Sequence, residues 1–268
     1  MKSPQERKTV LITGGSSGIG YELSKYFVIE GYRILWVSKP KEELSQSKDK
    51  LYAAHKGADI YTLTQDLSLS DGPTKVKDWV IGHGWDVNVL VNNAGYGTYG
   101  YVKDQDIQKE LSMIDLHIKT LYHLTRLFLD DMIKADEGTI INLSSISAFQ
   151  PIPKMCTYAS TKAFVKHFSL GLQEELRMTG SNVNVLSACP AAISNTPFKS
   201  HEDMHHVKTF QGIAATTVEE VGADIWSAFN KKKDLQVSGK KARRLMILNK
   251  LLPLSYQKKL IKQETEKI

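Results

Sequence analysis

The chain has 268 residues, of which 41% are hydrophobic and 24% charged, and its formal net charge is +6. This size suits one large α/β domain with a full core, and there is no linker, repeat or low-complexity tract to suggest a modular or disordered chain. The two cysteines, Cys156 and Cys189, form neither a disulfide framework nor a metal-binding pattern. We expect both to be small buried side chains in a reducing compartment.

The positive charge is concentrated at the end of the chain. Residues 231–268 carry twelve Lys or Arg and three acids, a net of +9, which leaves −3 for the rest. We therefore do not interpret the whole protein as a nucleic-acid binder. Residues 1–8 are polar and do not resemble a secretion signal, and no segment approaches the roughly 20 apolar residues of a membrane span. The expected location is the cytoplasm.

The first predicted strand, Thr9 to Thr13, leads into a glycine-rich turn. The turn reads Gly14-Gly15-Ser16-Ser17-Gly18-Ile19-Gly20 and is followed by a helical pattern. Strand, glycine turn and helix form the setting of a dinucleotide site, because small residues and free helix N–H groups can contact phosphates. A turn of this kind could also be a simple connection.

The second predicted strand, Arg33 to Ser38, ends next to Lys39. In dinucleotide-binding folds, a carboxylate about 20 residues after the glycines selects NAD, whereas a cation accepts the extra phosphate of NADP. No acid lies between Arg33 and Lys41, so Ser38 and Lys39 favour NADP(H) over NAD(H). The alternative is that Lys39 is a solvated loop lysine.

The pattern continues through the middle of the chain. Helices are predicted at 40–56, 70–83, 104–132 and 158–178, and strands at 59–64, 87–91, 139–143 and 182–188. Asp66 follows the third strand and can accept a hydrogen bond from an adenine amine, although it could be only a turn former. Asn92-Asn93-Ala94-Gly95 follows the fourth strand. Six alternating strands and helices predict a parallel sheet with helices on both faces, and its ligand crevice lies at the carboxyl ends of the strands.

Tyr158 and Lys162 lie four residues apart, so on a helix they share one face. A free phenol has a pKa of about 10 and is a poor acid-base catalyst at neutral pH, but a neighbouring ammonium lowers that pKa. Ser145 follows an apolar run, where its hydroxyl can reach the same substrate oxygen. This group suits reduction of a carbonyl or oxidation of an alcohol, although Tyr-x-x-x-Lys also arises by chance.

These motifs, in this order and spacing, resemble those of the short-chain dehydrogenase/reductase family over about residues 8 to 238. The resemblance implies a Rossmann-type, doubly wound parallel sheet of about seven strands in the order 3-2-1-4-5-6-7, with Leu235 to Val237 as the last strand. It implies that Tyr158 is the acid-base residue, that Lys162 binds the nicotinamide ribose and that Ser145 holds the substrate carbonyl. The expected cofactor contacts are Gly14, Ser16, Ser17, Gly18, Ile19, Gly20, Ser38, Lys39, Asp66, Leu67, Asn93, Ala94, Gly95, Tyr158, Lys162, Ile193 and Thr196.

The chain departs from the family pattern at two places. The family has an Asn in the long fourth helix that orders a water next to the lysine, and here His117 takes that position, or Asp115 if the alignment shifts. A histidine can hydrogen-bond at both ring nitrogens, so a proton relay can persist in altered form; the alternative is a helical histidine without a catalytic part. After the sixth strand the family's Pro-Gly reads Pro190-Ala191.

We expect one catalytic domain at 1–238, with a substrate lid at about 194–217, and a basic amphipathic extension at 239–268. The extension could lie on a membrane surface, cover an apolar substrate pocket, contact a partner subunit or pack on its own core. His201, His205 and His206 of the lid are not expected to bind a metal. The family resemblance also implies a homodimer or homotetramer.

The sequence predicts an NADP(H)-dependent oxidoreductase that acts on a carbonyl or secondary alcohol, with an apolar ketone or acyl-type substrate favoured. The alternatives are an NADP(H)-binding sensor or scaffold with weak catalysis, suggested by His117 and Ala191, and a tail-driven RNA or membrane adapter.

Overall fold

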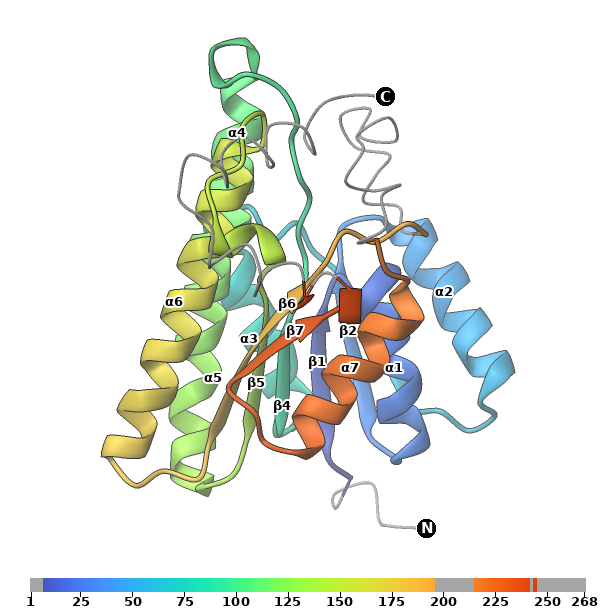
Figure 1. Cartoon of the computed structure of the whole chain (residues 1–268). Coiled ribbons are helices and arrows are strands. Elements are labelled where there is room, and N and C mark those ends of the chain that lie inside the picture. Colours follow the sequence, from blue (N-terminus) through green and yellow to red (C-terminus); the bar gives the residue numbers. More distant parts are fainter. Residues whose placement is uncertain (1–6, 196–214, 242, 245–268) are drawn as a thin grey trace.

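The structure is a computed structural model, and it describes residues 7–195, 215–241, 243 and 244 (Figure 1). Seven parallel strands form one sheet in the order β3-β2-β1-β4-β5-β6-β7, as predicted. The strands are β1 (Thr9–Thr13), β2 (Arg33–Ser38), β3 (Ile60–Thr64), β4 (Val89–Asn92), β5 (Thr139–Leu143), β6 (Asn184–Pro190) and β7 (Leu235–Ser238). Strand β1 pairs with both β2 and β4, so the strand order reverses beside it.

The helices cover both faces of the sheet (Figure 1). They are α1 (Gly18–Ile29), α2 (Lys41–Ala54), α3 (Gly72–Gly82), α4 (Ile107–Ile114), α5 (Leu121–Ala135), α6 (Cys156–Met178) and α7 (Val218–Asn230). Side chains of α1, α2 and α7 pack on one face, and those of α3, α5 and α6 on the other. Alternate residues of β1 contribute to the two cores: Val10 and Ile12 to the first, Leu11 to the second. Such strands have no polar face, which is why they read as continuous apolar runs.

The long helix predicted at 104–132 is more complex in the structure. It begins at Ile107, after a short 3-10 turn, and its middle section, Asp115–Thr120, is a π-helical segment that joins α4 to α5. Asp106 caps the start of α4 by accepting hydrogen bonds from the backbone N–H groups of Gln108 and Lys109. The π-helical segment contains His117, and such segments are frequent at functional sites.

Several helix and strand boundaries differ from those predicted from the sequence, and one helix was not predicted. Helix α6 begins at Cys156, two residues before the predicted start, and Cys156 is exposed, whereas we expected it to be buried. Cys189 is buried as predicted. Helix α7 was not predicted. Most of the predicted lid and of the C-terminal extension lies outside the described residues, and none of the described helices is long and apolar enough to span a membrane.

Candidate active site

The glycine turn between β1 and α1 lets a ligand approach the backbone closely. Gly14 has a φ of +63°, a conformation that favours glycine, and a Cβ on Gly20 would overlap the carbonyl oxygen of Gly14. The side chain of Ser17, at the start of α1, makes no capping hydrogen bond. The first N–H groups of α1 are therefore available to an anionic ligand, so the turn fits the diphosphate of a dinucleotide.

The loop after β4 is bonded directly to this turn. The hydroxyl of Thr13 accepts hydrogen bonds from the backbone N–H groups of Asn93 and Ala94, each at 2.9 Å. The side-chain amide of Asn93 donates to the carbonyl oxygens of Thr13, at 2.9 Å, and Gly14, at 3.0 Å. Two segments that were predicted separately to contact the nucleotide thus form one continuous surface.

Lys39 and Asp66 lie side by side at the end of the turn where the adenosine is expected. The ammonium of Lys39 is 2.6 Å from the carboxylate of Asp66, which also accepts hydrogen bonds from the backbone and hydroxyl of Ser68. Burial opposes ionisation of Asp66, but the hydrogen bonds from Lys39 and Ser68 outweigh it, and the pKa of Asp66 is lowered. The side chain of Lys39 is 75% exposed, so it is free to leave this pair for an anionic ligand.

Glu43 also lies at this end, and sequence reasoning missed it. The buried hydroxyl of Ser16 donates to the Glu43 carboxylate at 2.8 Å and is 3.2 Å from the hydroxyl of Ser38. Glu43 is in the first turn of α2, four residues after Lys39. An acid in the first turn of the helix after β2 was a signal that could have identified it, because that turn faces the carboxyl end of the strand.

Tyr158, Ser145 and Lys162 come together at the carboxyl end of β5. Tyr158 and Lys162 are in the first turns of α6, and Ser145 precedes a 3-10 turn. All three side chains are buried, a hydrogen bond joins Ser145 to the Tyr158 phenol, and the Lys162 ammonium lies 5.8 Å from the centroid of the Tyr158 ring. The predicted group is therefore assembled, with both helix residues on one face.

The pKa of Tyr158 moves in the opposite direction to the one expected. Burial raises the pKa of the Tyr158 phenol to about 12, and this effect exceeds the opposing hydrogen bond from Ser145. Burial also lowers the pKa of Lys162 to about 8. The sequence showed the neighbouring charge but not how completely both groups are removed from water. At neutral pH the phenol is protonated.

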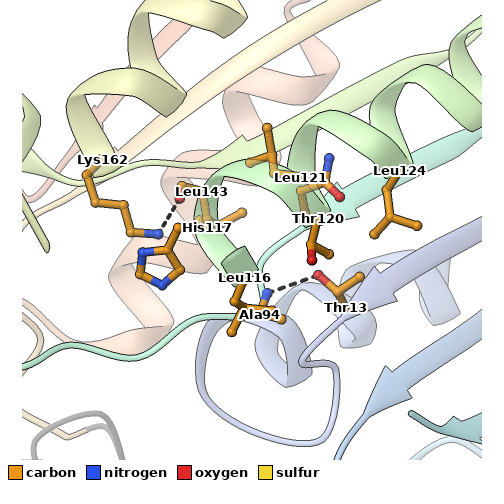
Figure 2. A pocket seen from close by; sticks show the side chains of 10 residues that line it. Thr13, Ala94, Leu116, His117, Thr120, Leu121, Leu124, Leu143 and Lys162 are labelled. Carbon is orange, nitrogen blue, oxygen red and sulfur yellow. Dashed lines mark hydrogen bonds between the residues drawn. The ribbon is translucent and has the colours of Figure 1, made fainter. Parts of the chain in front are cut away.

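The Lys162 side chain points into a small cavity lined largely by the π-helical segment and the start of α5, with residues of β1, β4 and β5 on its other sides (Figure 2). Its ammonium donates to the carbonyl oxygen of Leu143 at 2.9 Å. The cavity has a volume of about 10 Å³, roughly the space of one water molecule. Asn92 is one of its lining residues, and the buried side-chain oxygen of Asn92 has no hydrogen-bond partner within the described part of the chain. Its lining residues are Thr13, Asn92, Ala94, Leu116, His117, Thr120, Leu121, Leu124, Leu143 and Lys162.

His117, and not Asp115, faces Lys162 (Figure 2). Asp115 instead forms an ion pair at 2.5 Å with Lys119. His117 is 2% exposed, its Nε2 accepts a hydrogen bond from the backbone N–H of Tyr96 at 3.3 Å, and its Nδ1 is 2.9 Å from the hydroxyl of Thr161. Burial, and then the charge of Lys162, hold the pKa of His117 well below its usual value.

The remaining predicted contacts are only partly described. Leu67 is buried in the core, where its carbonyl oxygen accepts a hydrogen bond from the hydroxyl of Thr120. Ile193 forms an isolated parallel bridge with Thr216. Thr196 and the three lid histidines lie outside the described residues, and within those residues no cluster of His, Cys, Asp or Glu is arranged to hold a metal ion.

Residues 8–206 match the profile of the short chain dehydrogenase family. The chain belongs to this family. Among curated proteins it is similar to the NADP-dependent 3-hydroxy acid dehydrogenase YdfG of Escherichia coli, with 29% identity over 222 residues, or 81% of this chain and 87% of the relative. It is also similar, at 28% identity over 206 residues, to an uncharacterized oxidoreductase of Staphylococcus epidermidis, covering 77% of this chain and 86% of the relative.

Two solved structures with the short-chain dehydrogenase fold superimpose on this chain. A short-chain dehydrogenase from Sphingobium yanoikuyae in complex with NADPH superimposes with a TM-score of 0.77 at 27% identity, over 86% of this chain and 87% of the other. A bulky-bulky ketone specific alcohol dehydrogenase from Comamonas testosteroni gives a TM-score of 0.73 at 25% identity, over 86% and 85%. As a short-chain dehydrogenase, the protein is an oxidoreductase.

Proposed function

We propose that this protein is an NADP(H)-dependent oxidoreductase that interconverts a carbonyl compound and a secondary alcohol. The observation that carries the proposal is the buried group of Ser145, Tyr158 and Lys162 at the carboxyl end of β5, beside a turn that fits a dinucleotide. When bound, the nicotinamide cofactor supplies or accepts the hydride.

Each side chain of the group has a distinct part in the proposal. Tyr158 holds its proton at neutral pH, because burial raises the pKa to about 12, and the protonated phenol is the form that gives a proton to a carbonyl oxygen. Ser145 lies within hydrogen-bonding reach of that phenol and binds the same oxygen. Lys162 holds the nicotinamide ribose, and its ammonium stabilises the phenolate that remains after the proton has left.

Support for NADP(H) comes from the adenosine end of the site and from relatives. Lys39 is exposed and can exchange its partner Asp66 for the extra phosphate of NADP. The names of YdfG and of the Sphingobium structure specify NADP and NADPH. Glu43 adds a negative charge beside Ser16 and Ser38, so we expect the preference over NAD(H) to be weaker than Lys39 alone would give.

The surroundings of Tyr158 support an apolar substrate. Tyr99, Met113 and Met155 pack with Tyr158 in one buried cluster, against which Tyr96, Ile152 and Ala192 also pack. A wall of aromatic, aliphatic and thioether groups favours a ketone or acyl-type compound with an apolar substituent next to the carbonyl. The name of YdfG specifies a 3-hydroxy acid, which carries an alcohol, and that of the Comamonas enzyme specifies bulky ketones, which carry a carbonyl; these are the reduced and oxidised forms of the reacting group proposed here.

A sensor or scaffold without catalysis is not favoured, because Ser145, Tyr158 and Lys162 are all present, with Ser145 hydrogen-bonded to Tyr158 and the Lys162 ammonium 5.8 Å from the centroid of the Tyr158 ring. The decisive experiment is the variant Tyr158→Phe, which removes only the phenolic oxygen. Loss of a general acid costs about 10²- to 10⁴-fold in turnover, whereas calorimetric NADPH affinity should stay within about twofold of the unmodified protein. Turnover of a ketone panel that survives this change would contradict the proposed mechanism, and absence of NADPH binding by the unmodified protein would contradict the cofactor.

A homodimer or homotetramer through α5 and α6 remains a prediction, supported by aromatic side chains on these helices. Tyr122 and Phe164 are 49% and 38% exposed, and both rings lie against Phe168. Light scattering of the purified protein tests it, with Phe164→Glu as the variant expected to dissociate the oligomer. Three further features likewise remain predictions. They are a boundary between the catalytic domain and the C-terminal extension at about residue 238, a membrane contact of that extension, and a cytoplasmic location.

A further inference from the structure

His117 lies at the centre of a chain of hydrogen bonds between two parts of the site. The backbone N–H of Tyr96 donates to Nε2 of His117 at 3.3 Å, and Nδ1 of His117 is 2.9 Å from the hydroxyl of Thr161. The Thr161 hydroxyl in turn donates to the carbonyl oxygen of Tyr158 at 2.8 Å. The chain therefore runs from the β4 loop, through the π-helical segment, to the helix that carries Tyr158.

These contacts determine which ring nitrogen carries the proton. Nε2 accepts from a backbone N–H, so it is unprotonated. The only proton of the Thr161 hydroxyl is given to Tyr158, so this hydroxyl accepts the proton of Nδ1. His117 is thus a neutral imidazole with its proton on Nδ1, and both nitrogens are engaged in holding the fold.

The shape of the site supports the same arrangement. A Cβ on Gly95 would lie 2.6 Å from Nε2, so the ring fills the space that glycine leaves in the loop. The His117 ring also packs edge-on against the Tyr158 ring, with centroids 5.9 Å apart. Lys162, the charged group that faces the ring, gives its hydrogen bond to Leu143 rather than to the imidazole.

We propose that His117 is a positioning residue that clamps the Gly95–Tyr96 backbone to α6, and that it does not relay protons for Lys162. The clamp fixes the nucleotide-binding loop relative to Tyr158, so that a bound cofactor and the proton donor meet in one geometry. It rests on the proposed function for the identity of that cofactor and for Tyr158 as the proton donor.

The variant His117→Asn separates the clamp from a relay. Asparagine is the residue that the family resemblance expects here, but its shorter side chain cannot span from Tyr96 to Thr161. The clamp predicts that this variant raises the NADPH dissociation constant about tenfold, the loss expected when a partly buried N–H loses its acceptor, together with a fall in kcat. Unchanged NADPH affinity with retained turnover and an altered pH profile would establish a relay and overturn the proposal.

Variants of Thr161 test the clamp without changing the imidazole of His117. Thr161→Val keeps the shape of the side chain and removes the acceptor of Nδ1–H, so it should weaken NADPH binding by about the same factor, whereas Thr161→Ser should restore most of the affinity. Thr179→Val, at the C-terminal end of the same helix, removes a more exposed hydroxyl that also donates to a backbone carbonyl, that of Leu176, at 3.0 Å, and it should change nothing. Equal affinities for all three variants would contradict the clamp.

Two measurements on the protein without nucleotide keep this test independent of the proposed function. Nitrogen-15 NMR of the His117 ring should show the Nδ1–H form from about pH 6 to 9. Amide hydrogen exchange at Tyr96 should become about tenfold faster in His117→Asn and Thr161→Val. An Nε2–H tautomer, or exchange that does not change in either variant, refutes the clamp, whereas a clamp without NADPH binding refutes the function alone.

Discussion

Lys162 is the buried charge from which the most quantitative prediction follows. The side chain is 6% exposed, and burial lowers its pKa from 10.5 to about 8. A difference of about 2.5 pKa units corresponds to about 3 kcal/mol by which the folded state disfavours the ammonium. Below pH 8 the lysine is protonated in both states, so this destabilisation is present in full. As the pH rises from 8 to 10.5, the unfolded chain binds more protons than the folded one, and the destabilisation disappears.

The variant Lys162→Met keeps the length of the side chain and removes the charge. It also removes the 2.9 Å hydrogen bond to Leu143, which costs about 1 kcal/mol. We therefore expect the variant to be about 2 kcal/mol more stable than the unmodified protein at pH 7, about equally stable at pH 10, and inactive at both. The gain at pH 7 is the stability that the site gives up in order to keep an ammonium beside Tyr158.

Urea unfolding at pH 7 and pH 10, followed by circular dichroism, measures this difference. The control is Lys166→Met, one turn further along α6, where the ammonium also donates to a backbone carbonyl, that of Ala148, at 3.2 Å but is only half-buried. It should give no gain at pH 7. A destabilised Lys162→Met at pH 7, or a stability difference that is the same at both pH values, would refute the reasoning.

Two further predictions concern the nucleotide-binding end of the site. Glu43→Gln removes a carboxylate that accepts a hydrogen bond from Ser16. The variant should lower the dissociation constant of NADPH about three- to tenfold, because one charge that repels the phosphate is gone, whereas its affinity for NADH should not improve. Calorimetry with both nucleotides tests this, and equal gains in affinity for NADPH and NADH would contradict the reasoning. Gly20→Ala places a methyl group against the carbonyl oxygen of Gly14 and should lower the affinity for both nucleotides more than tenfold. Gly171→Ala, where a methyl group meets no atom of the described residues within 4 Å, is its control and should bind both nucleotides normally.

Much of the fold could be predicted because its strands are buried on both faces. The predicted limits of β1, β2 and β5 match the structure, and the expected seventh strand is present. Helix α7 was missed although its start has a clear signal: Thr217 caps it by accepting a hydrogen bond from the backbone N–H of Glu220. The π-helical segment could not be predicted from the sequence, because it results from tertiary packing, which leaves no local sequence pattern.

The candidate site could be located but not described from the sequence. Spacing placed Tyr158 and Lys162 on one face, but the pKa of Tyr158 depends on desolvation by the whole surrounding core. The partners of His117 are 21 and 44 positions away along the chain, so its two engaged nitrogens became evident only in three dimensions. Glu43 lies in the first turn of α2, just beyond the stretch from Arg33 to Lys41 in which an acid was expected, and it approaches Ser16 across 27 positions of the chain.

The π-helical segment determines how the side chains of α5 are rotated about the helix axis relative to those of α4. Each residue of an α-helix turns the chain by about 100°, so one residue more or less between α4 and α5 would rotate their side chains relative to each other by that angle. As built, Met113 points to Tyr158, while Leu124 and Phe128 point to the sheet. A shortened helix could satisfy one of these two partners but not both. Insertions and deletions between residues 115 and 120 should therefore be poorly tolerated, because they would shift α5 on the sheet as well as His117 beside Tyr158.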